Sequence, residues 1–314
     1  MPGKVTIGMA CFNHERFVLD ALNSVNVQNY PNIEIIIIDD CSNDKSVEVI
    51  ADWVKNKCKY PCIFIRNEVN QGLHYVLNKI IDLASGEYLS FLATDDIIFP
   101  DKINYQVQVM ENLDQSFAAC YGDTSRINEY GHVISTSEFD KWFGPDFIPP
   151  SGRILKDVVS NFLFFIQSAL FRNSCLNAIN FKFDKKYISE DWHLQIKLAT
   201  EYNLFGCKKV FCQYREVSTS ITRTNFVPSN IHNIIYNHFT LLYDFSKDLY
   251  EEDLYFEKLK SLCKQAIHHK KFLLSKIFKM YFLIVKIYPH KIFELDLIKL
   301  LLKASFDKLN LFSR

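Results

Sequence analysis

The sequence has little glycine, with only 9 Gly among 314 residues. A dinucleotide-binding enzyme would show a Gly-x-Gly-x-x-Gly turn after its first strand, and a P-loop enzyme would show Gly-x-x-x-x-Gly-Lys-Ser/Thr, because such turns bring backbone N–H groups close to phosphates. Neither pattern occurs in the chain. If the protein binds phosphates, a metal ion held by carboxylates is therefore the expected means.

The chain also lacks net charge, since 36 Lys and Arg balance 36 Asp and Glu. A general nucleic-acid-binding protein needs an excess of cations to displace counterions from phosphates, so we expect no nucleic-acid partner. The charge is unevenly distributed, because residues 256–314 contain 13 Lys and Arg against 4 Asp and Glu. Such asymmetry is typical of a basic, partner-facing segment on a more acidic body.

No secretory signal follows Met1, and no run reaches the roughly 18–20 apolar residues that a membrane-spanning helix needs. The 9 cysteines are an odd number and are scattered along the chain. Scattered thiols without an export signal predict a reducing, cytoplasmic environment. The pairs Cys58/Cys62 and Cys207/Cys212 have no second pair at a zinc-site spacing, so we interpret them as structural or incidental thiols.

The first 120 residues alternate between two hydrophobic periods. Short apolar runs, typical of strands buried on both faces, are followed by segments in which the apolar residues have helical spacing. We expect strands at 5–11, 33–38, 62–65 and 88–92, and helices at 16–27, 45–55, 72–83 and 101–113. This alternation predicts an α/β fold with a mostly parallel sheet and helices on both faces.

The remainder of the chain has less regular patterns. We expect strands at 118–121, 167–171 and 205–214, a hairpin at 127–134, a loop at 143–151 and a helix at 191–202. After residue 230 the sequence is helical in pattern, Lys-rich and aromatic. We therefore predict two domains, an α/β domain at 1–229 that carries the chemistry and a helical C-terminal region at 230–314.

Polar clusters follow three of the predicted strands. They are Asn13-His14-Glu15, Asp39-Asp40-Cys41-Ser42 and Thr94-Asp95-Asp96. Ligands of open α/β sheets bind beyond the carboxyl ends of the strands. Paired carboxylates repel each other unless a cation or a polar ligand separates them, so two such pairs favour a binding site. The alternative is that Asp40 and Asp96 only cap the helices that follow.

Several segments resemble the opening of family 2 glycosyltransferases, in that family's order and spacing. They are Val5-Thr6-Ile7 to Phe12-Asn13, Ser24-Val25 with Gln28-Asn29-Tyr30, Glu34 to Asp44, Asn70-Gln71-Gly72 with Asn78, and Ser85 to Leu92 leading into Asp95-Asp96 and Pro100. The resemblance covers residues 4–113. It implies a GT-A fold that binds a nucleotide sugar and transfers the sugar with inversion, as in bacterial surface-glycan synthesis.

The resemblance also implies roles for individual residues. Asn13, Asp39 and Asp40 match family positions near the nucleoside, and Asn70 belongs to the same expected nucleotide-sugar site.

Asp95 and Asp96 match the end of the family's metal-binding motif, usually Asp-x-Asp, and are expected to hold Mn²⁺ or Mg²⁺. Ala93 replaces the first Asp of that motif, so the metal would depend mainly on Asp95, which would also contact the nucleotide sugar.

Ser189-Glu190-Asp191-Trp192 resembles the family's Glu-Asp motif at a helix start. The resemblance implies that Asp191 is the general base, with Glu190 beside it in the catalytic group. An acceptor hydroxyl must lose its proton as it attacks the anomeric carbon, and a carboxylate within hydrogen-bond reach takes that proton. Without the resemblance, the pair is an acidic first turn favoured by the helix dipole. Trp192 is either a stacking surface for an acceptor sugar or a core residue.

Tyr214-Arg215 and Ser218-Thr219-Ser220 resemble a segment that closes over the donor. Arg215 or Arg223 is expected to neutralise the leaving diphosphate. The alternative is a surface arginine in a loop.

Residues 268–291 interleave histidines and lysines with aromatic and aliphatic residues. A basic amphipathic segment is typical of binding to an anionic membrane surface, which would suit an acceptor held on a lipid carrier. The alternative is a helical subdomain that packs its apolar stripe internally and leaves its lysines in solvent.

Together these observations predict an inverting, metal-dependent hexosyltransferase, cytoplasmic and peripheral at the inner face of the cytoplasmic membrane. It would transfer a sugar from a nucleotide-diphosphate sugar, by default a UDP-sugar, to a glycan or lipid-linked glycan acceptor in bacterial surface polysaccharide, capsule or lipopolysaccharide synthesis. A nucleotidyltransferase would need a Gly-rich, basic loop after its first strand, which residues 10–14 do not provide. A catalytically idle relative that acts as an assembly partner in a glycan-synthesis complex is the other alternative, and Ala93 favours it.

Overall fold

The computed structural model describes residues 2–217, 231–246, 252–268 and 274–291. The chain divides into two compact units. The first unit consists of Met1–Val158, Phe162–Asp184 and Glu190–Ser218, and the second of Val159–Asn161, Lys185–Ser189 and Thr219–Arg314. The predicted boundary between residues 229 and 230 lies outside the described residues, so the two-domain division at that point stays a prediction.

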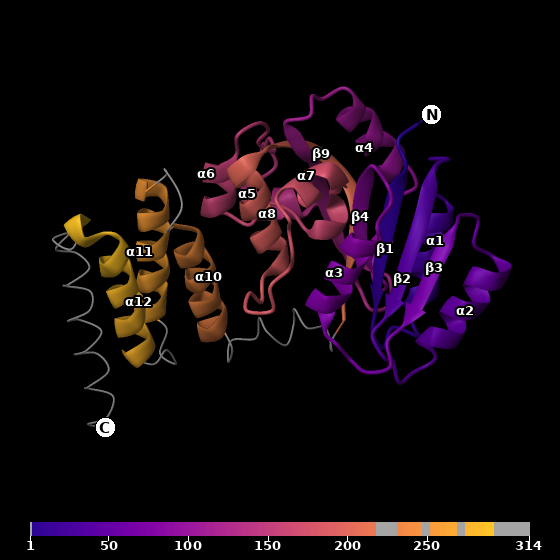
Figure 1. Ribbon diagram of the computed structural model, residues 1–314, viewed down its shortest axis with the longest axis horizontal. Helices are drawn as coiled ribbons and strands as arrows, with labels where there is room; N and C mark the ends of the chain where they lie inside the picture. Colours follow the sequence, from indigo (N-terminus) through magenta and orange to yellow (C-terminus); the bar gives the residue numbers. More distant parts are fainter. Residues whose placement is uncertain (1, 218–230, 247–251, 269–273, 292–314) are drawn as a thin grey trace. The chain divides into compact units, whose positions relative to one another are not determined.

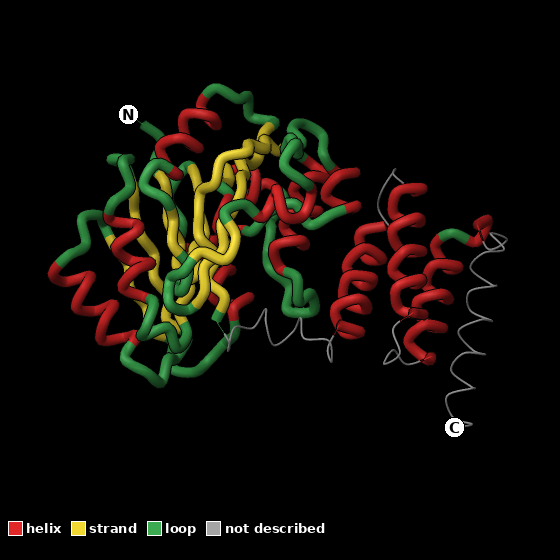
Figure 2. The backbone as a smooth tube through the Cα atoms, turned by 180° about the vertical axis from the view of Figure 1, so that it is seen from behind, coloured by secondary structure: helices red, strands yellow, loops and turns green. Residues whose placement is uncertain are grey.

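The first unit is built on a 9-stranded mixed sheet, in the order β3-β2-β1-β4-β8-β6-β9-β5, with β7 beside β6. Figure 1 labels β1 to β4 of this sheet. The strands are β1 Val5–Cys11, β2 Ile33–Asp39, β3 Cys62–Arg66, β4 Tyr88–Ala93, β5 Ile97–Ile98, β6 Phe117–Asn128, β7 Val133–Ser135, β8 Leu170–Arg172 and β9 Asn203–Glu216. Figure 2 shows the strands as a single curved layer with helices packed around it.

The helices of this unit occupy the segments between the strands. They are α1 Val18–Asn26, α2 Ser46–Asn56, α3 Leu73–Leu83, α4 Lys102–Glu111, α5 Glu138–Phe143, α6 Leu155–Ser160, the 3-10 turn η1 Ile166–Ser168, α7 Asn173–Ala178 and α8 Glu190–Glu201. The N-terminal strands and helices lie within a few residues of their predicted bounds. The periodicity of the apolar residues was therefore a sound guide in this half of the unit.

The parallel register places the three polar clusters at one edge of the sheet. β1 pairs in parallel with β2 and with β4, so that Cys11 lies opposite Asp39 and Ala10 lies opposite Ala93. Because neighbouring parallel strands end at the same edge, the loops that follow β1, β2 and β4 are neighbours in space. This register brings segments that are some 80 residues apart in sequence to one place.

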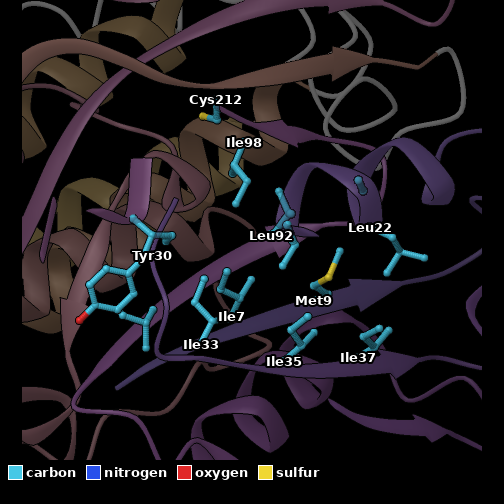
Figure 3. Packing of buried hydrophobic residues seen from close by; sticks show 14 of the residues in the cluster. Ile7, Met9, Leu22, Tyr30, Ile33, Ile35, Ile37, Leu92, Ile98 and Cys212 are labelled. Atoms are coloured by element: carbon cyan, nitrogen blue, oxygen red, sulfur yellow. The ribbon is translucent and has the colours of Figure 1, made fainter. Parts of the chain in front are cut away.

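The core of the first unit lies against the parallel strands. Side chains of β1 and β2, such as Ile7, Met9, Ile35 and Ile37, are fully buried against Leu22 of α1 (Figure 3). Burial on this scale is the main favourable term in folding, at roughly 25 cal/mol for each Å² of apolar surface. It fixes the strands whose carboxyl ends carry the polar clusters.

The second half of the sheet differs from the sequence-based expectation. The strand expected at 205–214 is present as β9, but β6 continues well beyond the strand expected at 118–121 and pairs in parallel with β9. The apolar run of β6 is interrupted by Asp123, Thr124 and Ser125, which are buried. All three form hydrogen bonds inside the fold, which is why a strand continues through a polar stretch.

One further expectation needed correction, whereas the expected loop and hairpin are present. The segment expected as a strand at 167–171 is instead η1 followed by the short strand β8. The loop expected at 143–151 is preceded by the helix α5, whose start is capped by Ser137, since its Oγ accepts a hydrogen bond from Asp140 N at 3.0 Å. The predicted hairpin is present as β6 and β7, with Gly131 at φ +84° in the turn.

The second unit contains α10 Ile231–Ser246, α11 Glu252–His268, α12 Leu274–Ile287 and the 3-10 turn η2 Pro289–Lys291. Its buried side chains include Phe239, Tyr255, Leu259, Ile277 and Met280, which come from all three α-helices. The expectation of helices in this part of the chain holds for the residues that the structure describes. None of the described helices is long and apolar enough to cross a membrane.

Gly86 allows a close approach between the loop before β4 and β1. A Cβ atom at this position would lie 2.6 Å from the backbone N of Thr6 and 2.7 Å from the backbone O of Tyr88. We expect Gly86→Ala to lower the free energy of unfolding by about 1–3 kcal/mol, because backbone atoms cannot move aside cheaply.

The check on Gly86 is a urea unfolding curve. Glu68→Ala serves as the control, because its exposed side chain should change stability by less than about 0.5 kcal/mol. Equal stability of Gly86→Ala and Glu68→Ala would contradict the close packing.

Candidate active site

The first polar cluster ties two loops together through Asn13. This residue has φ +56°, a left-handed conformation that Asn tolerates better than most residues. Its backbone N donates to Ser42 Oγ at 2.8 Å, and its Oδ1 accepts a hydrogen bond from Asn43 N at 2.8 Å. Asn13 is exposed, so it is accessible to a ligand, and its expected contact with a nucleoside stays a prediction.

Asp39 is fully buried at the end of β2. Its Oδ1 accepts a hydrogen bond from Ser42 N at 2.9 Å, and its Oδ2 accepts one from Ser42 Oγ at 2.5 Å. The carboxylate therefore shapes the turn that follows β2. Its expected contact with a nucleoside stays a prediction.

Asp40 holds the loop that contains Asn70. Its Oδ1 accepts hydrogen bonds from Asn67 Nδ2 at 2.7 Å and from Gln71 N at 2.9 Å, and its Oδ2 accepts one from Gly72 N at 2.7 Å. Gly72 directly precedes α3, so Asp40 supports the start of that helix and not of α2, which follows Asp40 in sequence. Asn70 itself is exposed on the loop.

Asp95 is the more accessible member of the second carboxylate pair. Its Oδ2 lies 3.8 Å from His14 Nε2, and the other ring nitrogen of His14 lies 2.8 Å from Thr94 Oγ1. Asp95 is only partly buried, with 13% of its side chain exposed. This carboxylate is therefore available to a ligand at the edge where β1, β2 and β4 end.

Asp96 has a different environment. It is 2% exposed, its Oδ1 accepts a hydrogen bond from Arg215 N at 2.8 Å, and its Oδ2 accepts one from Gln167 Nε2 at 2.9 Å. Burial, followed by the charges of Asp95 and Asp191, raises the pKa of Asp96 well above its usual value. Both of its oxygens are engaged inside the protein, so Asp96 joins β4 to β9 and to η1.

The guanidinium group of Arg215 is fixed beside this pair. Its Nε donates to the backbone O of Asp95 at 2.8 Å, its Nη2 lies 3.4 Å from Asp20 Oδ2, and its Cζ lies 5.0 Å from the ring centroid of Phe17. Arg215 is 3% exposed and is not a surface arginine in a loop. Its expected contact with a diphosphate stays a prediction. Arg223 and residues 218–220 lie outside the described residues.

Glu190 and Asp191 form the first turn of α8, as expected. Asp191 Oδ2 accepts a hydrogen bond from Ile166 N at 2.9 Å. Burial, and then the neighbouring Glu190, raises the pKa of Asp191 well above its usual value, and burial also raises the pKa of Glu190. A carboxylate with a raised pKa is a stronger base than an ordinary aspartate, as proton abstraction near neutral pH requires.

Trp192 follows this pair but is 4% exposed, and its indole Nε1 donates to Val158 O at 2.6 Å. The structure therefore favours the core role for Trp192 over the stacking role.

One short turn connects the two carboxylates. Ile166 N binds Asp191, and the side chain of the next residue, Gln167, binds Asp96. The turn η1 therefore binds both Asp191, the expected general base, and Asp96, the last residue of the expected metal motif. Sequence reasoning missed Gln167 because a strand was expected at this position, and no local pattern marks an amide that bonds to a distant carboxylate.

An aromatic strip borders these segments. It consists of Trp142, Phe165 and Tyr214, all half-buried, with ring centroids 5.4 Å apart for the first two and 5.1 Å apart for the nearly parallel last two. Phe165 precedes Ile166 in the chain, and Tyr214 precedes Arg215. The strip offers an apolar surface close to the segments that hold the carboxylates, of the kind that lines small-molecule sites.

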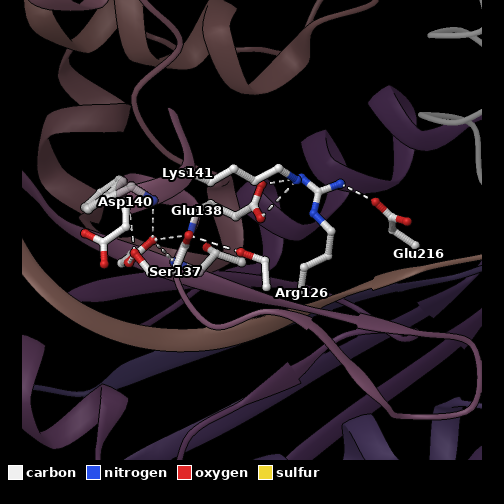
Figure 4. A network of polar contacts seen from close by, with 10 residues as sticks. Arg126, Ser137, Glu138, Asp140, Lys141 and Glu216 are labelled. Atoms are coloured by element: carbon white, nitrogen blue, oxygen red, sulfur yellow. Dashed lines mark hydrogen bonds and ion pairs between the residues drawn. The ribbon is translucent and has the colours of Figure 1, made fainter. Parts of the chain in front are cut away.

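A partly buried ion-pair network supports the strip from β6. Figure 4 shows Arg126 between Glu138 of α5 and Glu216 of β9. Its Nη2 lies 2.5 Å from Glu138 Oε2, and its Nη1 lies 2.6 Å from Glu216 Oε1. Asp123 accepts hydrogen bonds from the backbone N of Glu138 at 3.1 Å. These contacts fix α5, which carries Trp142, on the long strand pair.

A divalent cation fits Asp95 better than Asp96. Among the described residues, no group of three or more His, Cys, Asp or Glu side chains is placed to hold a metal ion. A metal that takes one protein carboxylate and completes its shell with substrate phosphates is consistent with Asp95. The oxygens of Asp96 already accept protein hydrogen bonds, so the prediction that it is a ligand gains no support from its surroundings.

Comparison with known proteins decides the family. Residues 6–172, just over half of the chain, match the model of Glycosyl transferase family 2. The chain belongs to this family. The resemblance recognised in the sequence is thereby confirmed.

Two relatives illustrate the range of the family 2 matches. The chain is 32% identical over 151 residues to an uncharacterized glycosyltransferase of Rickettsia conorii, which covers 48% of this chain but only 23% of that protein. It is 26% identical over 224 residues to the UDP-Glc:alpha-D-GlcNAc-diphosphoundecaprenol beta-1,3-glucosyltransferase WfgD of Escherichia coli, which covers 71% of this chain and 81% of that enzyme.

Solved structures agree on the fold. Residues 1–349 of S. aureus TarS, in complex with UDP-GlcNAc, match with a TM-score of 0.60 and 14% identity over 91% of this chain and 89% of that one. The mannosyltransferase PcManGT of Pyrobaculum calidifontis, in complex with GDP-Man and Mn2+, matches with a TM-score of 0.59 and 14% identity over 98% of this chain and 88% of that one. At this identity the likeness concerns the fold, and it confirms the predicted GT-A architecture.

The two neighbouring aspartates should respond differently to truncation. We expect Asp96→Ala to lower the free energy of unfolding by about 1–3 kcal/mol, because the buried Arg215 N–H and Gln167 amide lose their acceptor. Asp95→Ala is the matched control and should cost less than about 1 kcal/mol, since its carboxylate is more accessible.

Urea unfolding curves of the two variants check this expectation. A larger loss of stability for Asp95→Ala than for Asp96→Ala would contradict the division of roles between the two carboxylates.

Proposed function

We propose that the protein is a glycosyltransferase that transfers a sugar from a UDP-sugar to a glycan acceptor with inversion at the anomeric carbon. The observation that carries the proposal is the turn η1, which holds Asp191 through Ile166 N and Asp96 through Gln167. The pair Asp95-Asp96 follows β4 at the edge where ligands of such sheets bind, so a donor held there would lie near the carboxylate of Asp191.

Asp191 is proposed to act as the general base. The acceptor hydroxyl would give its proton to Asp191 as its oxygen bonds to the anomeric carbon, and the bond from that carbon to the diphosphate would break on the opposite side. A single displacement of this kind inverts the configuration, giving a β-linkage from an α-linked donor. The raised pKa of Asp191 supports this role, and Glu190 beside it contributes to that shift.

The leaving nucleoside diphosphate needs positive charge nearby. When bound, Mn²⁺ or Mg²⁺ would supply that charge as a Lewis acid, and Asp95 would hold the metal together with the diphosphate oxygens. Arg215 would add a fixed guanidinium group beside Asp95. Asp96 would position Asp95 and Arg215 from the protein interior through its buried hydrogen bonds.

The choice of donor and acceptor rests on relatives. The name of the Escherichia coli relative specifies UDP-Glc as donor and a diphosphoundecaprenol-linked acceptor, and the TarS structure contains UDP-GlcNAc. These names support a UDP-sugar donor and a lipid-linked glycan acceptor. The process that we propose for this reaction is bacterial surface polysaccharide, capsule or lipopolysaccharide synthesis. A cytoplasmic protein at the inner face of the cytoplasmic membrane would meet both substrates.

The second unit offers a surface for that membrane. On α12, Phe278 and Phe282 are 50% and 66% exposed and lie one turn apart, with Lys279 and Lys286 also exposed. The segment 274–291 contains four lysines and no acidic residue. Aromatic side chains flanked by lysines fit the boundary between anionic headgroups and acyl chains.

A donor panel tests the proposed reaction. We expect one of the UDP-, GDP- or dTDP-sugars to raise the melting temperature in the presence of Mn²⁺ and to be hydrolysed slowly without acceptor. Asp95→Ala should lose the metal-dependent shift, whereas Asp191→Asn should keep it but lose turnover by at least about 100-fold, the range that a general base contributes.

The panel also tests the alternative of an idle assembly partner. Failure of every nucleotide sugar to bind, or full turnover by Asp191→Asn, would contradict the proposed function. Binding of a donor without turnover, across all acceptors tried, would favour the idle relative.

Vesicle co-sedimentation tests the membrane surface. Binding to vesicles with anionic phosphatidylglycerol should fall at least about tenfold in the double variant Lys279→Glu/Lys286→Glu, because each lysine near such a surface contributes about 1 kcal/mol. The control Lys55→Glu/Lys57→Glu makes the same charge change on exposed lysines of the first unit. Equal loss in both variants, or indifference of the wild type to anionic lipid, would contradict this surface.

A further inference from the structure

Two polar side chains of α4 lie fully inside the first unit. Lys102 and Gln106 are both 0% exposed and are one helical turn apart on the same face of the helix. Burial lowers the pKa of Lys102 to about 8, because an ammonium group loses its hydration inside the protein. Neither residue has a part in the reaction as proposed above.

Both side chains bind carbonyl groups at the end of η1. Lys102 Nζ donates to Ala169 O at 3.1 Å and to Ser90 Oγ at 2.8 Å. Gln106 Nε2 donates to Ser168 O at 2.8 Å. Hydrogen bonds in a buried setting are electrostatically stronger than in water, and their loss leaves carbonyl oxygens unsatisfied.

The other end of the same turn holds the carboxylates. Ile166 N donates to Asp191, and Gln167 Nε2 donates to Asp96. Residues 166–169 therefore accept hydrogen bonds from α4 through the carbonyls of residues 168 and 169. They donate hydrogen bonds to the two carboxylates through residues 166 and 167. The helix α4 begins at Lys102, six residues after Asp96, so a short segment of backbone also connects Asp96 to the helix that binds the turn.

We propose that Lys102 and Gln106 are positioning residues for sugar transfer. They fix the carbonyls of residues 168 and 169. Because these residues are next to Ile166 and Gln167, this also fixes the two donors that orient Asp191 and Asp96. The inference rests on the proposed role of Asp191 and deepens it. A displacement of about 1 Å at a positioning group can cost as much as about 100-fold in rate, so the two bonds matter for activity as well as for packing.

Arg172 provides a matched comparison. It is also a buried cation, 2% exposed, and it binds two backbone carbonyls, through Nη2 to Met110 O at 3.0 Å and through Nε to Phe117 O at 3.1 Å. Met110 lies at the far end of α4 from Lys102. A substitution of Arg172 therefore removes buried hydrogen bonds of the same kind without touching the carbonyls of η1.

The test compares Lys102→Met and Gln106→Leu with Arg172→Met. We expect both α4 variants to lower kcat for the best nucleotide-sugar donor by about 10- to 100-fold per folded molecule, with the donor KM within about twofold of wild type. Hydrogen exchange at the amide of Ile166, followed by NMR, should become faster in both. Arg172→Met should lose stability but keep kcat and the exchange rate of Ile166.

The exchange measurement separates this inference from the proposed function. Lack of turnover in the wild type would contradict the proposed function, whereas the Ile166 amide would still report on the turn. Unchanged exchange and unchanged kcat in Lys102→Met and Gln106→Leu would overturn the inference. An equal loss of kcat in Arg172→Met would overturn it as well, because the effect would then be one of general stability.

Discussion

The rest of the site depends on the two hydrogen bonds that the carboxylate of Asp96 accepts. It is buried at the end of β4 and accepts one hydrogen bond from β9, through Arg215 N, and one from η1, through Gln167. A buried carboxylate next to Asp95 is unfavourable unless it is well satisfied, and the raised pKa of Asp96 reflects that cost. The two hydrogen bonds bring together three segments that are far apart in sequence, namely the turn after β4, η1 and β9.

This arrangement divides the work between two adjacent residues. Asp96 is buried and holds η1 and β9 by hydrogen bonds, while Asp95 is more accessible and lies at the edge where a nucleotide sugar would bind. Arg215 serves both, because its backbone N binds Asp96 and its guanidinium binds the carbonyl of Asp95. The turn η1 also binds Asp191 through Ile166, so the donor side and the acceptor side of the proposed reaction share one support.

The sequence allowed a good prediction of the parallel half of the sheet. The apolar run of β2 and the helical spacing around it are strong local signals, and the strand-end clusters lie where parallel strands must place them. The position of Asp191 at a helix start was also predictable, from motif resemblance. These features depend on patterns within about ten residues of one another.

The missing parts depend on contacts across the chain. The role of Gln167 comes from a carboxylate 71 residues away. The polar part of β6 is satisfied by distant segments, since Asp123 accepts hydrogen bonds from two backbone N–H groups at the start of α5. The different environments of Asp95 and Asp96 follow from the contact between the turn after β4 and β9, which no local pattern encodes. One signal was available and unused, since Ser137 before an acidic turn is a typical N-cap that would have located α5.

A crystal structure of the protein with UDP and Mn²⁺, with the metal located by its anomalous scattering, tests the central claim most directly. The account predicts that the diphosphate lies at the edge where β1, β2 and β4 end. It also predicts Mn²⁺ at roughly 2.0–2.2 Å from an Asp95 oxygen, while Asp96 keeps its bonds to Arg215 and Gln167. Mn²⁺ bound directly by Asp96, or UDP bound away from this edge, would contradict it.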